Sequence, residues 1–204
     1  MDVLVVGAGV IGLAVARALS LLPDSRDPDR PAVRIEHASL VPPGLLPDLD
    51  RLRPRLVVQP GFVWSDGWLR ERIGPERARW AYPFRTLLLR GIPLAGSSDA
   101  PYDPIDPWRG IRAAVGRVGP DGRSANPDVE EALSPEEAVG LYTVGAAAAV
   151  GEPGRGHLEV GAVADLAVLS TPDLASAVRY PGVPVLETWV GGQRSWPRSP
   201  GTGG

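Results

Sequence analysis

Asp99 is the acid in this sequence whose surroundings are best suited to chemistry. An apolar run at residues 92–95 is long enough for a buried parallel strand, and Gly96, Ser97 and Ser98 free the backbone immediately before the carboxylate. Ligands of α/β proteins bind beyond the carboxyl ends of the strands, so an acid here is better placed for chemistry than for packing. The alternative is a turn aspartate that only caps its own loop.

His37 ends a second predicted strand, at residues 32–37. A histidine at the carboxyl end of a parallel strand can point its imidazole into a shared mouth where a metal sits, although a lone histidine is more often structural. A third strand, at residues 56–58, falls between His37 and Asp99 in the sequence. If the three strands are consecutive and parallel, the outer two are roughly 10 Å apart, a gap that both side chains can bridge to one ion. We therefore expect Gln59 to lie between them.

A glycine-rich turn near the N-terminus offers a different chemistry. Gly7, Gly9 and Gly12 follow an apolar run and match a dinucleotide fingerprint, in which helix amides hold a pyrophosphate and Glu36 reaches a ribose hydroxyl. The stretch VVGAGVIGLAVARAL resembles the opening of flavin-dependent amine oxidases, for which FAD is the cofactor. The alternative is that the glycines only let a helix and a strand approach closely.

The composition excludes several kinds of site. The chain of 204 residues has no Cys and no Lys, which rules out disulfides, thiolate metal sites, a Schiff-base lysine and a carbamylated lysine bridge. His37 and His157 are the only histidines, too few for a three-histidine zinc centre. The net charge of -3 favours neither nucleic acid nor an anionic membrane as a partner. No signal peptide or membrane span is predicted, so we expect a cytoplasmic protein.

Local signals predict the elements that position these residues. Asp106 followed by Pro107 is typical of a helix N-cap and first helical residue, and Ser134 with Glu137 forms a capping box. Residues 185–190 and 193–196, joined by two glycines, predict a hairpin. Five aromatic residues could line a substrate pocket, or simply pack in a long connection: Trp64, Trp68, Trp80, Tyr82 and Phe84.

The order of these segments resembles the carboxyl-terminal half of metal-dependent amidohydrolases, similar to amidohydrolase family 3. RIEHASLVPP at residues 34–43 is followed by LVVQPGFVWSDGW at 56–68 and GIPLAGSSDAPYDPIDPWRGI at 91–111. Similar stretches continue at residues 134–151, 156–170 and 185–196.

The resemblance implies a (β/α)8 barrel that uses divalent metal, commonly zinc, to hydrolyse non-peptide carbon–nitrogen bonds of small amide-like substrates. It makes His37 a metal ligand, and Asp99 both a metal ligand and the catalytic general base. The family's HxH pair and bridging acid have no counterpart here, and Val6 stands where the fifth-strand histidine belongs. We therefore expect a partial, catalytically impaired chain; an FAD-dependent oxidoreductase or a non-catalytic remnant is the alternative.

The predicted fold class is α/β: a partial (β/α)8, TIM-barrel-like parallel sheet made of the last three to four βα units, with a small C-terminal β appendage. We predict a βα unit at residues 1–31, the barrel portion at 32–155, the appendage at 156–196 and a disordered tail at 197–204. The first unit is either a diverged part of the barrel or a flavoprotein-like fusion. An open parallel sheet leaves strand edges unpaired, which favours self-association.

Overall fold

A computed structural model of the chain describes residues 3–5 and 33–197. The glycine turn of Gly7, Gly9 and Gly12, the helix expected after it, the position of Val6 and the tail at 198–204 fall outside the described residues. The boundaries predicted for the four parts of the chain remain predictions.

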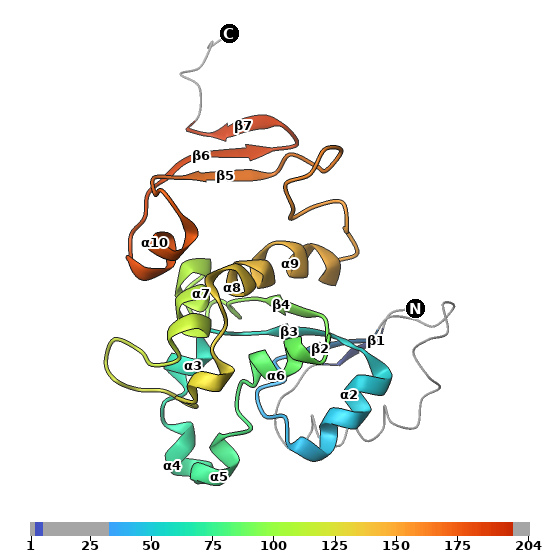
Figure 1. Cartoon of the computed structure of the whole chain (residues 1–204), viewed down its shortest axis with the longest axis vertical. Coiled ribbons are helices and arrows are strands. Elements are labelled where there is room, and N and C mark those ends of the chain that lie inside the picture. The colour runs from blue at the N-terminus through green and yellow to red at the C-terminus, as the bar shows by residue number, and fades with distance from the viewer. Residues whose placement is uncertain (1–2, 6–32, 198–204) are drawn as a thin grey trace.

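A parallel sheet forms the centre of the described fold (Figure 1). Its order is β1-β2-β3-β4, and the register pairs Ile35 with Leu56, and Leu56 with Leu94. The three strands predicted around His37 and Asp99 are therefore consecutive and parallel, which confirms that expectation. Strand β3 is buried along most of its length because its apolar side chains are covered on both faces. The strands span Val3–Val5 (β1), Val33–Glu36 (β2), Arg55–Val58 (β3) and Leu94–Gly96 (β4).

Short helices fill the connections between and after these strands. The structure places an excursion of four helices between β3 and β4, where the sequence predicts one long connection. The helices are η1 (Pro43–Leu45), α2 (Leu46–Leu52), α3 (Phe62–Ser65), α4 (Leu69–Ile73), α5 (Pro75–Ala78), α6 (Phe84–Leu89), α7 (Pro107–Gly116), η2 (Val129–Glu131), α8 (Pro135–Tyr142), α9 (Val144–Ala149) and α10 (Leu174–Arg179).

The predicted helix starts are confirmed. The Asp106 carboxylate accepts a hydrogen bond from the Trp108 amide at 3.0 Å, so it caps α7. At the start of α8, Ser134 and Glu137 exchange hydrogen bonds of 3.1 and 2.8 Å with each other's backbone amides. Each cap satisfies amide groups that the first helical turn leaves unpaired, which fixes where the helix begins.

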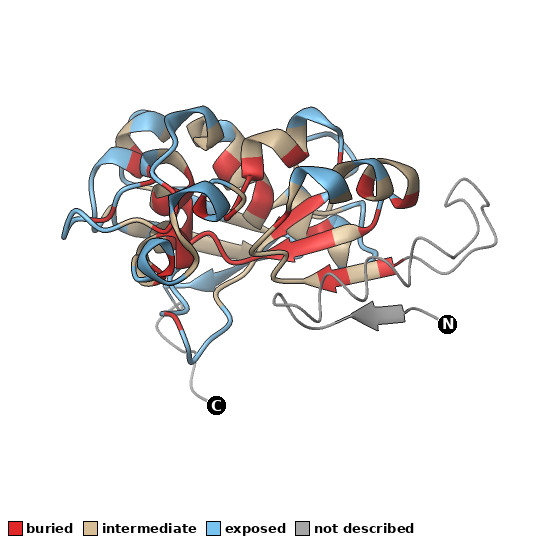
Figure 2. Cartoon of the chain, turned by 90° about the horizontal axis from the view of Figure 1, so that it is seen from below, coloured by how far each residue is buried: buried red, intermediate tan, exposed pale blue. Residues whose placement is uncertain are grey.

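The helix α9 approaches β4 closely because Gly145 has no side chain. A Cβ at this position would lie 2.1 Å from the carbonyl oxygen of Leu94. Figure 2 shows that buried positions concentrate on the central strands and on the helix surfaces that pack around them. Arg117 lies fully buried in this core, where it donates to the carbonyls of Asn126 and Tyr82 at 3.2 and 3.1 Å. Burial lowers the pKa of its guanidinium to about 10.

A second, antiparallel sheet follows α9 and confirms the predicted hairpin. It consists of β5 (Leu166–Leu169), β6 (Val185–Val190) and β7 (Gln193–Trp196), in the order β5-β6-β7. The sheet lies beyond α8, α9 and α10 as seen from the parallel sheet (Figure 1). No residue of these three strands is buried in the described structure. The fold is thus a mixed α/β structure with one parallel and one antiparallel sheet.

Candidate functional site

His37 lies at the carboxyl end of β2, where the sequence predicts it. Its backbone turns out of the strand with a φ of 71°, and its amide donates to the carbonyl of Val57 on β3 at 2.8 Å. This bond continues the parallel ladder by one residue, and so it fixes the backbone of His37 at the end of the sheet. The imidazole is half-buried.

Gln59 orients the imidazole of His37. It follows β3 directly and is 2 % exposed, and its Oε1 lies 2.9 Å from Nδ1 of His37. Its Nε2 donates to the hydroxyl of Ser97 at 2.8 Å and lies 3.5 Å from the carbonyl oxygen of Val57, which can only accept. The amide oxygen of Gln59 therefore faces Nδ1 of His37, and Nε2 of His37 is the ring nitrogen that this bond leaves for a ligand.

Aromatic rings extend from His37 toward the loop that contains Asp99. The Phe62 ring stacks near the imidazole at a centroid distance of 6.3 Å, and Tyr102 meets Phe62 edge-on at 4.9 Å. Because Tyr102 lies only three residues after Asp99, this row of rings connects the ends of β2 and β4 across the end of β3.

Asp99 lies in the turn after β4, with a φ of 55° and an exposed side chain. The turn is closed by the amide of Tyr102, which donates to the Asp99 carbonyl at 2.9 Å, and by the amide of Ala100, which donates to the hydroxyl of Ser98 at 3.2 Å. Neither bond uses the Asp99 carboxylate, so the alternative of an aspartate that caps its own loop with its side chain gains no support from them.

The described residues fit a metal only in part. His37 has the geometry of a ligand, since one ring nitrogen is fixed by Gln59 and the other is free of that bond. Within residues 3–5 and 33–197, however, no group of three or more His, Asp or Glu side chains comes close enough to hold an ion. A catalytic zinc centre commonly uses three protein ligands, so this part of the chain does not form one alone.

Glu36 has a partner of its own. Its carboxylate accepts from Nε of Arg34 at 2.6 Å, and the glutamate side chain is 17 % exposed. The ion pair offers a structural role for the acid that the dinucleotide interpretation assigns to a ribose. No finding supports the FAD alternative.

A buried carboxyl that is not among the sequence-predicted site residues lies near the same end of the sheet. Asp66, 9 % exposed, accepts from the hydroxyl of Tyr82 at 2.5 Å. Burial raises the pKa of the Asp66 carboxyl, although hydrogen bonds to Tyr82, Tyr102 and Trp68 oppose the rise. The signal that could have found it is that Asp66 is the single charged residue between Arg55 and Arg70, in a stretch rich in apolar and aromatic side chains.

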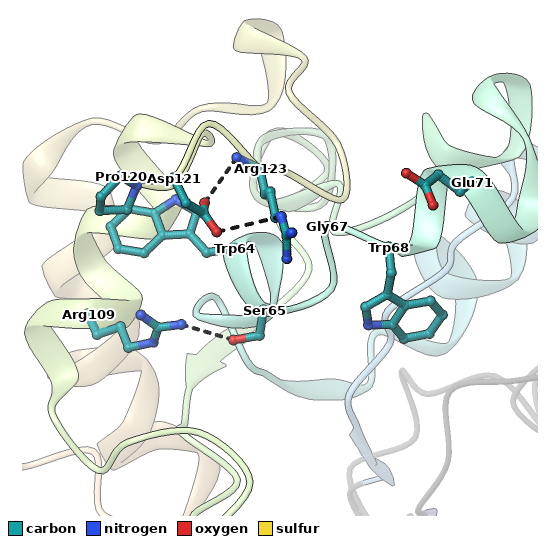
Figure 3. Close-up of a pocket in the computed structure, with 9 residues that line it drawn as sticks. All are labelled: Trp64, Ser65, Gly67, Trp68, Glu71, Arg109, Pro120, Asp121 and Arg123. Atoms are coloured by element: carbon teal, nitrogen blue, oxygen red, sulfur yellow. Dashed lines mark hydrogen bonds and ion pairs between the residues drawn. The ribbon is translucent and has the colours of Figure 1, made fainter.

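Four of the five aromatic residues of the long connection divide into two groups, and Trp80 is half-buried outside both. Tyr82 and Phe84 are each 1 % exposed and pack in the core, as the packing interpretation predicts. Trp64 and Trp68 instead line a cavity of about 450 Å³ beside α3 (Figure 3). The packing interpretation is therefore confirmed for Tyr82 and Phe84, and the substrate-pocket interpretation of Trp64 and Trp68 stays a prediction.

Comparison with known proteins places this site in a family. A sequence model described as the amidohydrolase family matches residues 1–195, which include both His37 and Asp99. The chain belongs to the amidohydrolase family. The match begins at residue 1 and so covers the glycine-rich turn as well, and the flavoprotein-like start is unconfirmed.

Two relatives with longer matches show how much of the chain is shared. YtcJ of Bacillus subtilis (strain 168), whose name assigns it to the amidohydrolases, is 39 % identical over 67 % of this chain and 26 % of its own length. The N-substituted formamide deformylase of Arthrobacter pascens is 29 % identical over 82 % of this chain and 31 % of its own length. The chain thus spans between a quarter and a third of these relatives.

Solved structures give the same assignment. An uncharacterized metal-dependent hydrolase from Pyrococcus furiosus superposes with a TM-score of 0.63 and 39 % identity, over 78 % of this chain and 31 % of that one. A second such hydrolase, from Pyrococcus horikoshii OT3, superposes with a TM-score of 0.65 and 34 % identity, over 78 % of this chain and 32 % of that one. Among the residues that the structure describes, no helix has both the length and the apolar character needed to cross a membrane.

Proposed function

We propose that this chain is a portion of an amidohydrolase-type hydrolase that acts on carbon–nitrogen bonds of small amide-like molecules. In this proposal His37 and Asp99 are two of the side chains that hold a divalent metal such as zinc, and Asp99 also serves as the general base. The described sheet then corresponds to the last units of a (β/α)8 barrel. The formamide deformylase among the relatives, which by its name acts on an N-substituted amide, supports this substrate class.

One observation carries the proposal: Gln59 holds Nδ1 of His37 at 2.9 Å and is itself held by Ser97 at 2.8 Å. A buried amide that orients a half-buried imidazole at a strand end costs conformational freedom, and a purely structural histidine in a loop does not require it. The three residues come from the ends of β2, β3 and β4, so they are brought together only when the parallel sheet forms.

Because the described residues do not complete a metal centre, we propose that the chain alone is catalytically impaired. Zinc content after dialysis against zinc-free buffer, measured by mass spectrometry, tests this. We expect well below one zinc per chain, little change in His37→Ala or Asp99→Asn, and no turnover of an N-substituted formamide above the buffer rate. Stoichiometric zinc that survives dialysis and is lost in His37→Ala would overturn the impairment while supporting the ligand assignment. Stoichiometric zinc that both variants retain would overturn the ligand assignment.

A further inference from the structure

The cavity of about 450 Å³ beside α3 is separate from the His37 and Asp99 side chains, neither of which lines it (Figure 3). It lies between the segment that contains Trp64 and Trp68 and the loop that follows α7. Its volume is within the range of small-molecule sites, roughly 300–1,000 Å³.

One wall of the cavity is fixed by a hydrogen-bonded network. The carboxylate of Asp103, which is 6 % exposed, accepts from Nε of Arg109 at 3.0 and 3.1 Å and from the hydroxyl of Ser65 at 2.9 Å. Nη2 of Arg109 also donates to the Ser65 oxygen at 3.0 Å, and its guanidinium lies 5.6 Å from the centre of the Trp64 ring. The charge of Arg109 is therefore neutralised, and the Trp64 indole is held in place.

The opposite wall is a tight loop that two glycines allow to pack closely. The amide of Gly119 donates to the Arg123 carbonyl at 2.8 Å, and a Cβ on Gly119 would lie 3.3 Å from Cγ of Trp64. A Cβ on Gly67 would lie 2.8 Å from Cβ of Arg123. The stem of Arg123 is thus fixed against the backbone of Gly67, and its guanidinium extends into the cavity between the two indoles in the view of Figure 3.

The charges of the lining residues point to a neutral ligand. Arg109 is paired with Asp103, and Arg123 faces Asp121 at 3.8 Å, beyond hydrogen-bond distance. This leaves Glu71 as the remaining charged side chain of the lining, and it disfavours an anion. The guanidinium of Arg123, whose side chain is 76 % exposed, keeps donors for a carbonyl oxygen, while Glu71 and Asp121 can accept from an N–H group.

We propose that this cavity binds a small neutral aromatic amide, with its ring against the exposed indole of Trp68 and its carbonyl oxygen at Arg123. Indole faces favour flat rings. A neutral amide has a carbonyl oxygen that can accept from Arg123 and an N–H group that can donate to Glu71 or Asp121. The proposal concerns binding alone, and it does not require that the chain hydrolyse the ligand.

Three probes of similar size separate the contribution of the flat ring from that of the neutral charge: acetanilide, N-cyclohexylacetamide and phenylacetate. We expect saturable binding of acetanilide to the full chain by saturation-transfer NMR. The dissociation constants of the cyclohexyl amide, which lacks the flat ring, and of the phenylacetate anion should each be at least threefold larger. Phenylacetate binding as tightly as acetanilide, or no saturable binding of acetanilide up to its solubility limit, would overturn the proposal.

Variants locate the site. Trp68→Leu and Arg123→Ala should each weaken acetanilide binding roughly fivefold. Trp196→Leu and Arg77→Ala are matched controls, because Trp68 and Trp196 are 48 % and 50 % exposed and neither control residue lines the cavity. All four side chains lie at the surface, and circular dichroism verifies that each variant is folded. Equal binding by Trp68→Leu and Trp196→Leu would show that the amide binds elsewhere.

Discussion

Oε1 of Gln59 lies 2.9 Å from Nδ1 of His37, and the two residues come from the carboxyl ends of neighbouring parallel strands. Gln59 is buried and His37 is half-buried, so the bond connects the core of the sheet to the surface where a ligand would sit.

Gln59→Leu should lower the free energy of unfolding by about 1 to 2 kcal/mol. Leucine fills a similar volume, but it leaves Nδ1 of His37 and the hydroxyl of Ser97 without their shared partner. Urea denaturation measures the change. The other glutamine of the chain, Gln193, is exposed on β7, and Gln193→Leu is the matched control with little expected effect. Equal effects of the two substitutions would show that the buried amide does not stabilise the fold.

Asp66→Asn should change how stability depends on pH. Burial raises the pKa of the Asp66 carboxyl above its ordinary value of 3.8, so the folded chain holds this proton more tightly than the unfolded chain does. The stability that the folded chain gains from this tighter proton is present in full below pH 3.8, and it is lost as the pH rises through the folded-state pKa of Asp66.

Asparagine removes this titration but keeps an oxygen that accepts from the Tyr82 hydroxyl. As the pH rises from 4 to 7, the variant should therefore gain stability relative to the natural chain. Urea denaturation at both pH values gives the comparison. A stability difference that is the same at both would contradict a raised pKa.

Gly145→Ala should destabilise the chain by about 1 to 3 kcal/mol, because the new Cβ would lie 2.1 Å from the Leu94 carbonyl and push α9 away from β4. Gly140→Ala is the matched control in the neighbouring helix α8, where the nearest atom to a new Cβ is Cγ2 of Val144 at 4.0 Å. Alanine favours helix over glycine, so the control should be neutral or slightly stabilising. Thermal unfolding of both variants distinguishes a packing effect from a helix-propensity effect.

The isolated chain should self-associate. Its parallel sheet does not close into a barrel within the described residues, and the antiparallel sheet exposes Val190 and Trp196 at 61 % and 50 %. Sedimentation velocity over a concentration series should show larger species that Val190→Lys reduces. Val129→Lys, at a position that is 74 % exposed on η2, adds the same charge away from that sheet and should not reduce them. A monodisperse monomer at all concentrations would contradict the prediction.

The sequence by itself determined the local elements and the family. Asp106, Ser134 and Glu137 cap the helices where the sequence predicts, because a capping bond joins residues only two or three positions apart. The apolar runs predicted the strands to within two residues. Burial in a parallel sheet leaves a run of apolar residues that can be recognised in the local sequence. The order of motifs was enough to indicate an amidohydrolase.

Only the tertiary structure decided which of those residues meet. The bonds from Gln59 to His37 and Ser97 span 22 and 38 positions, and the cavity wall joins Ser65 to Arg109 across 44. The burial of Asp66 depends in the same way on Tyr82. Contacts over such separations depend on how strands and helices stack, which hydrophobic periodicity does not encode, so the chemistry of individual side chains follows from the folded chain rather than from their neighbours in sequence.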